Sequence, residues 1–313
     1  MVLVIGGTTL DFIINKKPEA IAKKEEIKED ELFINIGGGG SNASYVLSFL
    51  GTEVYFLTKF GNDLFSKPIE DFFKKHPKIK LIKTKKEGKT ALSFIFDFGD
   101  RAIYTFRGSN NNLTKRDLLE GLPHYKWFYI TSVKGKTTDF VRELFYESKK
   151  KEKKVFVNPS LYSVKALREE ILNSDLVILN KEEAFELTGT NDLKETLDIL
   201  NKKEKIEKIG IITDGKNGVY FKKLGNYYHL RINKVVNYLK IKVRDTTGAG
   251  DCFSATFFHF FVKRMFPLLD SLMLASLNSI FLIQKIGTKY SLTEKELLSL
   301  LRKTKNLFEI KKL

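Results

Sequence analysis

The sequence reads Asp245-Thr246-Thr247-Gly248-Ala249-Gly250-Asp251 directly before an apolar segment at residues 251–264. That segment is rich in Phe and predicts a helix buried between a sheet and other helices. The two glycines let the backbone approach a bound ligand closely. The free N–H groups at the start of a helix form a binding site for an anion. The stretch therefore predicts a phosphate site at the start of a buried helix.

Asp251 places a carboxylate in the first turn of this helix, beside the predicted anion site. A negative side chain next to a phosphate is unfavourable, so the acid needs a chemical reason. In phosphoryl transfer, a carboxylate accepts the proton of the attacking hydroxyl while backbone amides stabilise charge on the moving phosphoryl group. The alternative is an ordinary acid near a helix N-terminus, where acids are favourable. The tetrapeptide alone supports both interpretations equally.

A second glycine-rich stretch, Gly37-Gly38-Gly39-Gly40-Ser41-Asn42, lies between a short apolar run and a predicted helix at residues 42–50. Four glycines make a backbone surface that can lie close to a polyhydroxyl ligand, and Asn42 offers both a donor and an acceptor to hydroxyl groups. The alternatives are a flexible loop with a helix cap and a dinucleotide-binding turn. The dinucleotide fingerprint requires Gly at the position of Asn42, which makes it the weaker alternative.

A third stretch, Gly6-Gly7-Thr8-Thr9-Leu10-Asp11, follows the first predicted strand. Ligands of open α/β sheets bind at the carboxyl ends of the strands. A carboxylate at Asp11 can bind two hydroxyl groups of a substrate at once, whereas the alternative is a solvated acid in a turn. The stretch favours a substrate site at this edge of the sheet.

Short apolar runs alternate with helix-compatible stretches along most of the chain. The predicted strands are residues 2–5, 53–58, 127–131, 155–158 and 176–179. Such alternation predicts parallel strands joined by right-handed helical crossovers. Residues 91–98 and 102–106 depart from this alternation of strands and helices. In each segment every second residue is apolar, which places the apolar side chains on one face of a strand, and Gly99-Asp100 predicts a turn between the two segments. This hairpin is typical of a lid, and residues 12–35 can supply companion strands.

Composition limits the other possibilities. The net charge is +16, from 54 Lys and Arg against 38 Asp and Glu, but the lysines are scattered, so nucleic-acid binding is not favoured as the main role. A positive field also attracts nucleotides. No apolar run is long enough for a membrane span. The single cysteine, Cys252, excludes an internal disulfide, and we expect a cytoplasmic protein without a membrane partner.

Together these motifs resemble the ribokinase family, also called PfkB-type carbohydrate kinases. Gly37-Gly38-x-x-x-Asn42 and the Asp245–Asp251 stretch occur in the family's order and separation, and the resemblance covers nearly the whole chain. Shorter matches are Gly61-Asn62-Asp63, Asn180-x-x-Glu183 and Thr213-x-Gly215-x-x-Gly218. The resemblance implies an α/β, ribokinase-like three-layer sandwich with a mostly parallel central sheet and a small β-sheet lid. One kinase domain would span residues 1–313, with a lid formed by about residues 12–35 and 91–107.

The resemblance also implies roles for individual residues, with ATP and Mg²⁺ as cofactors. Asp251 is the catalytic base, and the anion hole is formed by Gly248, Ala249 and Gly250. The substrate side comprises Asp11, Gly38, Gly39 and Asn42, and the nucleotide side comprises Asn180, Thr213, Gly215, Gly218 and Asn278. Glu183 is implicated in organising Mg²⁺, through water because Mg²⁺ keeps several waters. Asp245 resembles a ligand of a monovalent cation such as K⁺, with residues 287–291 nearby.

The departures from the family concern the substrate. Ribose-specific members carry Asn at the position of Thr9, Lys at the position of Gly39, and a Glu near Thr131-Ser132-Val133. The sequence thus predicts an ATP-dependent kinase acting on a hydroxyl of a sugar or sugar-like molecule. A nucleoside kinase of the same family remains open, as does a non-catalytic sugar- or nucleotide-sensing protein. In several relatives the lids pair into a homodimer, which would cover the apolar face of this lid.

Overall fold

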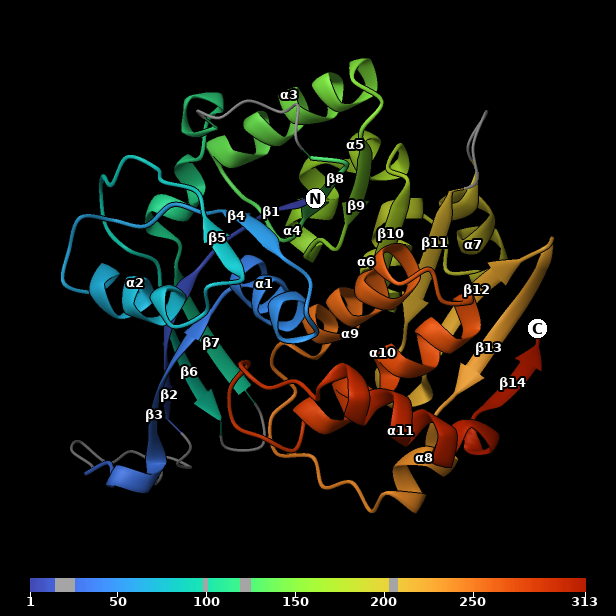
Figure 1. Cartoon of the computed structure of the whole chain (residues 1–313). Helices are drawn as coiled ribbons and strands as arrows, with labels where there is room; N and C mark the ends of the chain where they lie inside the picture. Colours follow the sequence, from blue (N-terminus) through green and yellow to red (C-terminus); the bar gives the residue numbers. More distant parts are fainter. Residues whose placement is uncertain (15–25, 98–100, 119–124, 203–207) are drawn as a thin grey trace.

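The computed structural model describes residues 1–14, 26–97, 101–118, 125–202 and 208–313. Within them, two sheets form the frame of the molecule (Figure 1). The strands of the large sheet are β1 (Val2–Ile5), β4 (Val54–Leu57), β5 (Ile79–Leu81), β8 (Trp127–Ile130), β9 (Lys154–Val157), β10 (Leu176–Asn180), β11 (Ile209–Thr213), β12 (Val219–Lys223), β13 (Asn226–Arg231) and β14 (Glu309–Lys312). The second sheet consists of β2 (Thr9–Ile14), β3 (Leu32–Gly37), β6 (Leu92–Asp97) and β7 (Arg101–Phe106).

The order of strands in the large sheet is β14-β13-β12-β11-β10-β9-β8-β1-β4-β5. Neighbours from β5 to β11 are parallel, whereas β12, β13 and β14 add antiparallel pairs at one edge. The chain leaves β1 toward β4 on one side and later returns to β8 on the other. Connections diverge at such a reversal of strand order, which is where open α/β sheets bind ligands. The predicted mostly parallel sheet is confirmed.

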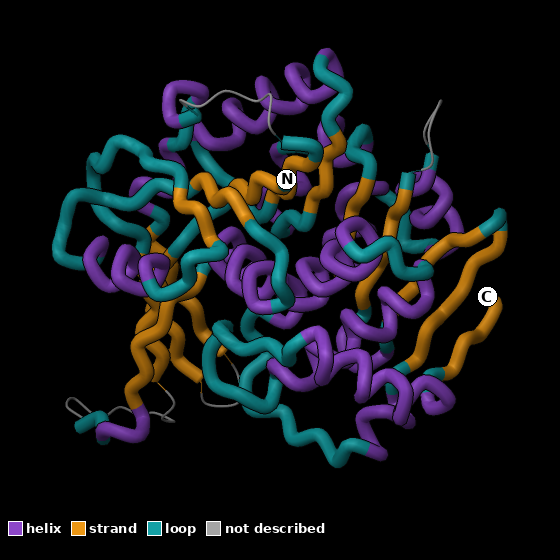
Figure 2. Tube along the Cα trace, viewed as in Figure 1, coloured by secondary structure: helices purple, strands orange, loops and turns teal. Residues whose placement is uncertain are grey.

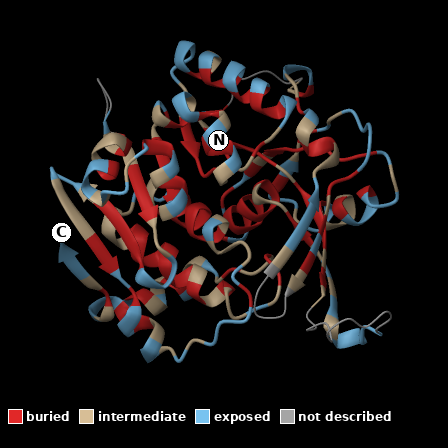
Figure 3. Cartoon of the chain, turned by 180° about the vertical axis from the view of Figure 1, so that it is seen from behind, coloured by how far each residue is buried: buried red, intermediate tan, exposed pale blue. Residues whose placement is uncertain are grey.

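Helices cover both faces of the large sheet (Figure 2). One layer contains α1 (Gly39–Phe49), α2 (Ser66–Lys74), α8 (Asn233–Tyr238), α9 (Ala249–Phe257), α10 (Leu268–Leu282) and α11 (Glu294–Thr304). The other contains α3 (Lys136–Lys150), α4 (Leu161–Ala166), α5 (Arg168–Leu172), α6 (Lys181–Thr188) and α7 (Leu193–Asn201). Val2 and Val4 of β1 join the first core, and Leu3 and Ile5 join the second. The strands are buried between two helical layers, as the predicted three-layer sandwich requires (Figure 3).

Short helical turns complete the described elements. They are the 3₁₀ turns η1 (Glu29–Glu31), η2 (Gly108–Asn112), η3 (Lys115–Asp117), η4 (Gly215–Asn217) and η6 (Lys305–Leu307), and the π-helical turn η5 (Phe258–Lys263). The predicted apolar helix at 251–264 is therefore α9 followed by η5. In the parts of the chain that the structure describes, no helix combines the length and apolarity needed to cross a membrane.

The register of the second sheet separates its two faces. Asp11 lies opposite Ser93, which lies opposite Thr105, so these three share one face. Phe12, Phe94 and Tyr104 share the other, where every described residue is apolar. This face is exposed on both edge strands, with Ile34 of β3 at 57% and Tyr104 of β7 at 66% of full exposure. The predicted hairpin and its apolar face are confirmed, while the predicted turn at 99–100 and residues 15–25 lie outside the described residues.

Candidate active site

The start of α9 forms the first part of the site. Gly248 caps the helix with φ 75°, a left-handed conformation that favours glycine. A Cβ on Gly248 would lie 2.9 Å from the Thr288 side chain, so both space and backbone require glycine. Gly250 is exposed, and a Cβ built on it meets nothing within 4 Å. The first N–H groups of a helix have no partner within the helix. The Ala249 N–H donates to the Thr246 carbonyl at 3.3 Å, and the exposed end of the terminus at Gly250 can bind an anion.

Asp251 lies one residue further along the first turn, facing α1. Its Oδ2 accepts a hydrogen bond of 2.8 Å from Asn42 Nδ2, and its Oδ1 lies 3.3 Å from the point where a side chain on Gly39 would begin. Burial raises the pKa of the Asp251 carboxyl above its usual range, while the Asn42 hydrogen bond and the Lys289 charge lower it. A carboxyl with a raised pKa is a stronger base once ionised.

The glycine-rich stretch brings α1 against β1. Gly38 is the N-cap of α1 with φ 90°, and α1 begins at Gly39, three residues before the predicted helix. The glycine run forms the first turn of α1. Glycine is required there because a Cβ on Gly40 would lie 2.7 Å from the carbonyl carbon of Gly6. This close approach puts Asn42 at the carboxyl edge of the sheet, beside the loop that leads to Asp11.

Asp11 enters the site from the second sheet and is 5% exposed. Its Oδ1 accepts a 2.6 Å hydrogen bond from Thr9 Oγ1, and its Oδ2 lies against the backbone of Gly37. Burial raises the pKa of Asp11, against the Thr9 hydrogen bond and the Lys289 charge. The four residues predicted for the substrate side therefore lie together: Asp11, Gly38, Gly39 and Asn42.

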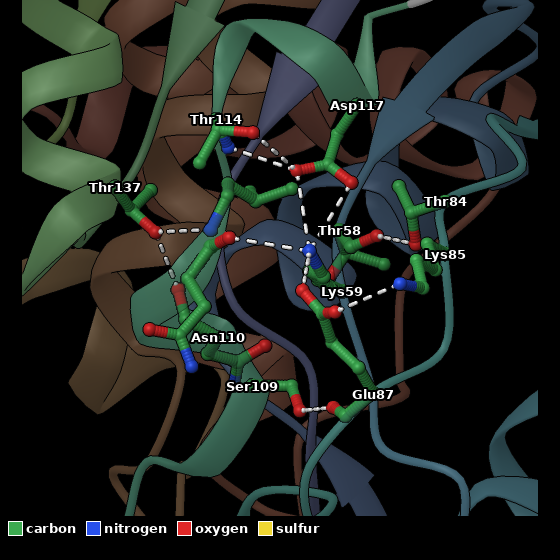
Figure 4. Close-up of polar contacts among 12 residues, drawn as sticks. Thr58, Lys59, Thr84, Lys85, Glu87, Ser109, Asn110, Thr114, Asp117 and Thr137 are labelled. Carbon is green, nitrogen blue, oxygen red and sulfur yellow. Dashed lines mark hydrogen bonds and ion pairs between the residues drawn. The ribbon is translucent and has the colours of Figure 1, made fainter.

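A polar network supports the loop that carries Asp11, and Figure 4 shows the part of this network around Lys59 and Asn110. The side-chain amide of Asn110 pairs with the Thr8 backbone: Nδ2 donates to the carbonyl at 2.8 Å, and Oδ1 accepts from N–H at 3.2 Å. Behind it, the buried Lys59 ammonium pairs with Glu87 at 2.7 Å and Asp117 at 3.3 Å. The Asn110 contacts hold η2 against the loop after β1, and the Lys59 contacts hold η3 against the segment after β4. The sequence pattern did not single out Asn110 or Lys59.

An apolar groove of about 300 Å³ approaches the start of α9 from the other side. Its lining includes Thr213, Gly215 and Gly218 of the β11–β12 turn, and Ala249 and Gly250 of α9. Its apolar walls come from α8, α9 and α10, including Val236, Phe253 and Ile280. The groove and the Asp11–Asn42 side thus meet at the same helix start.

Asn278 was predicted on the nucleotide side, but the structure does not bring it to the groove. It is fully buried, and its amide donates to Thr256 and Ser291 and accepts from the Leu292 N–H. Ser276 and Ser279, on neighbouring positions of α10, line the groove instead.

Asn180 and Glu183 form a reciprocal cap at the start of α6. Asn180 Oδ1 accepts from the Glu183 N–H at 2.8 Å, and Glu183 Oε2 accepts from the Asn180 N–H at 2.9 Å. Burial, together with the Asp251 charge, raises the pKa of Glu183 to about 7, while the hydrogen bond from the Asn180 N–H lowers it. A carboxyl crowded by other acids is a favourable place for a cation. Among the described residues, no three His, Cys, Asp or Glu side chains gather as a metal site.

Asp245 connects two loops around the start of α9. Its Oδ1 accepts from the Thr247 N–H at 2.7 Å, and its Oδ2 accepts from the Gly287 N–H at 2.8 Å. The side chain is almost fully buried. Asp245 therefore links Gly287, the first residue of the 287–291 segment, to the loop before α9, and the sequence interpretation had this segment near Asp245.

Lys289 is the functional-site neighbour that the sequence interpretation missed. Its Nζ donates to Asn42 Oδ1 at 2.5 Å. No motif marks it, because it follows α10 in an irregular loop of a chain with 54 Lys and Arg.

Curated proteins of known activity resemble this chain along most of its length. A ribokinase from Staphylococcus aureus is 27% identical over 301 residues, which cover 93% of this chain and 96% of that protein. A bifunctional ribokinase/ribose-5-phosphate isomerase A from Fructilactobacillus sanfranciscensis is 26% identical over 313 residues, covering 94% of this chain. The chain spans 55% of that bifunctional relative.

Solved structures share the fold of this chain, and most of its sequence matches one protein family. A ribokinase from Giardia lamblia superposes with a TM-score of 0.80 at 18% identity, covering 95% of this chain and 98% of that one. An adenosine kinase from Sinorhizobium meliloti gives 0.76 at 21% identity, covering 97% and 98%. Residues 1–295 match the pfkB family carbohydrate kinases. The chain therefore belongs to this family, and it is a phosphotransferase that acts on a hydroxyl group.

Proposed function

We propose that the chain transfers the terminal phosphoryl group of ATP to a hydroxyl of a sugar or sugar-like molecule. Asp251 takes the proton of that hydroxyl, and the N–H groups of Gly248, Ala249 and Gly250 hold the phosphoryl group in transit. Asp11 and Asn42 bind other hydroxyls of the substrate, beside the backbone of Gly38 and Gly39. One observation carries the proposal: Asp251 faces Asn42 on one side of a helix start whose other side borders the apolar groove.

The test is to replace Asp251 by Asn, which keeps the shape of the side chain and removes its ability to accept a proton. Turnover should fall about 10²–10⁴-fold, the typical contribution of a general base. Asp270→Asn is the matched control, because Asp270 also lies in the first turn of a helix, α10, but pairs with Lys305 at 2.7 Å. Near-normal turnover of a folded D251N enzyme would refute the role of Asp251.

The groove is proposed to bind the nucleotide. Its apolar walls suit a purine base, and Thr213, Gly215 and Gly218 offer backbone and hydroxyl groups to the rest of the nucleotide. Asn180 and Glu183 start α6 at the edge of the same sheet, and the acidic surroundings of Glu183 fit Mg²⁺ held through water. When bound, Mg²⁺ neutralises charge on the phosphates.

A monovalent cation such as K⁺ is proposed beside Asp245. The Asp245 carboxylate is buried and accepts the N–H groups of Thr247 and Gly287, so it places negative charge next to residues 287–291, which supports a cation there. Titration of activity with K⁺ at constant ionic strength, compared between wild type and Asp245→Asn, would show whether the site responds to the ion.

The identity of the phosphate acceptor is tested by a screen of sugars and nucleosides for acceptor-dependent ADP release. Preference for a nucleoside would favour the alternative of a nucleoside kinase. No release with any compound, together with tight binding of one of them, would favour a sugar- or nucleotide-sensing protein. The apolar outer face of the second sheet is proposed to pair with a second copy of the chain, because an exposed apolar face of this kind needs cover.

A further inference from the structure

Lys289 ends beside the Asn42–Asp251 pair, yet the proposed reaction gives it no role. The residue lies in the loop between α10 and α11. Its Nζ donates to Asn42 Oδ1 at 2.5 Å, to Ser41 Oγ at 2.9 Å and to Thr288 Oγ1 at 3.3 Å. An ammonium group has three N–H donors, and three oxygens surround this one.

The surrounding hydroxyls can only accept from the lysine. The Ser41 hydroxyl gives its proton to the Gly37 carbonyl at 2.8 Å, and the Thr288 hydroxyl gives its proton to the Ile36 carbonyl at 3.3 Å. A hydroxyl has one proton, so the lone pairs of both are turned toward Nζ. A neutral amine would point its own lone pair at one of these acceptors. The three oxygens around Nζ therefore suit a charged ammonium group better than a neutral amine.

The ammonium group also decides which way the Asn42 amide points. Because Oδ1 of Asn42 accepts from Lys289, Nδ2 must face Oδ2 of Asp251, at 2.8 Å. The flipped amide would place an NH₂ group against the ammonium and an oxygen against the carboxylate, and both contacts repel. A hydrogen bond donated to a carboxylate favours its ionised form.

The charges around this pair come from several elements. Lys289 interacts with the carboxyls of Asp11 from β2 and Asp251 from α9, and its Nζ lies 5.8 Å from the Phe72 ring of α2. Burial lowers the pKa of Lys289 below its usual range, while the charges of those two carboxylates raise it. Asp251 also interacts with Glu183 of α6 and Tyr129 of β8. Lys289 is thus the cation that faces both acids of the site.

We propose that Lys289 is a positioning residue of the phosphoryl-transfer site. Acting through Asn42, it orients the Asp251 carboxylate and keeps it ionised, so that Asp251 can accept the proton of the substrate hydroxyl. The proposal rests on the proposed function, since it assigns Asp251 as the base. It predicts that removing the charge at 289 changes the pH dependence of catalysis as well as its rate.

Three substitutions separate charge from packing. Lys289→Arg keeps the charge, Lys289→Gln keeps a hydrogen-bond donor without charge, and Lys289→Met removes both. In K289Q and K289M, the acid limb of kcat/KM should move up by about one pH unit or more, because Asp251 loses an adjacent cation. Activity at acidic pH then falls about tenfold more than activity at basic pH. K289R should keep the acid limb of wild type.

Lys285→Met is the matched control, since Lys285 lies in the same loop, is exposed, and stacks over Tyr290 instead of reaching the site. It should leave rate and pH profile unchanged. If K289Q and K289M lose activity equally at every pH, Lys289 only supports the loop and the proposal is wrong. If K289M does not fold, K289Q alone is compared with wild type, because its Gln side chain can still donate to the oxygens that surround Nζ in wild type.

A direct titration distinguishes this proposal from the proposed function. The ¹³C carboxyl resonance of Asp251, assigned by its absence in D251N, gives the pKa of the carboxyl without any substrate. A higher pKa in K289Q than in wild type supports the inference even if no acceptor is phosphorylated, in which case the proposed function alone fails. An unchanged pKa overturns the inference even in an active kinase.

Discussion

Gly37 leaves the space that the carboxylate of Asp11 occupies. A Cβ on Gly37 would lie 1.7 Å from Asp11 Oδ2, which is far inside contact distance. The backbone of Gly37 is not in the left-handed region, so an alanine there is excluded by space and not by conformation. The position of Asp11 is therefore set by the absence of a side chain on the neighbouring strand.

Gly37→Ala should displace the Asp11 carboxylate and lower kcat/KM for the phosphate acceptor by about 10²-fold, because misplacement of a binding group by an ångström has effects of this size. The groove on the other side of α9 is not touched, so the affinity for nucleotide should stay at the wild-type value. Steady-state kinetics and nucleotide titration measure the two effects. Equal loss of both would mean that the substitution disturbs the whole site.

The sequence predicted those site residues that belong to a recognisable motif. Asp251 and Asn42 were predicted on the same site, and the structure brings them to 2.8 Å. Lys289 was not predicted, because its role depends on the approach of a loop to Ser41 and Asn42, 248 and 247 residues away in the chain. Asn278 was predicted at the nucleotide, but its amide is used inside the core.

At the scale of single elements, α6 shows how a functional motif also builds structure. Asn180 is the N-cap of α6, and Glu183 completes the reciprocal cap. Asn180 is also proposed to bind the nucleotide, and Glu183 is proposed to organise Mg²⁺. Their contribution to folding and their contribution to binding therefore need to be separated by choice of substitution.

Asn180→Ala should lower the free energy of unfolding by about 1 kcal/mol, because the N–H of Glu183 loses its acceptor. Asn180→Ser keeps a capping oxygen and should stay within a few tenths of a kcal/mol of wild type. Urea unfolding measures both. If N180S weakens nucleotide binding at wild-type stability, the amide acts on the ligand; equal stability of N180A and wild type would contradict the capping role.

The local sequence pattern predicted several elements, but it did not predict where helix α1 begins. The strand at 2–5 has its expected range, and β6 and β7 carry the apolar face expected of residues 91–98 and 102–106. Helix α1 begins inside the glycine run, although glycine is a poor helix former, because only glycine lets α1 approach the backbone of Gly6. Tertiary packing here overrides local propensity.

At the scale of the whole molecule, the alternation of strands and helices predicted parallel strands with helical crossovers, and the family resemblance implied a sandwich, but neither predicted the strand order. The order depends on which strands pair over long distances, such as β1 with both β4 and β8. The divergence of the chain at β1 places the loops of Asp11 and Asn42 at the carboxyl edge. No local pattern contains that information.

The proposed pairing of the second sheet makes a prediction at this scale. Replacing Ile34 and Tyr104, both exposed on the apolar face, by Glu and Lys should convert a dimer into a monomer, because charge on both copies opposes burial. Sedimentation velocity measures the change. Thr105→Lys, an exposed position on the opposite face of the sheet, is the control and should stay dimeric. A wild-type chain that sediments as a monomer at all concentrations would contradict the pairing.

The residues of the site come from both ends of the chain. Asp11 and Asn42 lie near the beginning, whereas Asp251 and Lys289 lie near the end. Because a ribosome releases the N-terminal part first, the sheet can begin to assemble while half of the catalytic centre has not yet been translated. A premature stop codon before α9 should therefore leave no residual turnover, however much of the sheet such a fragment forms.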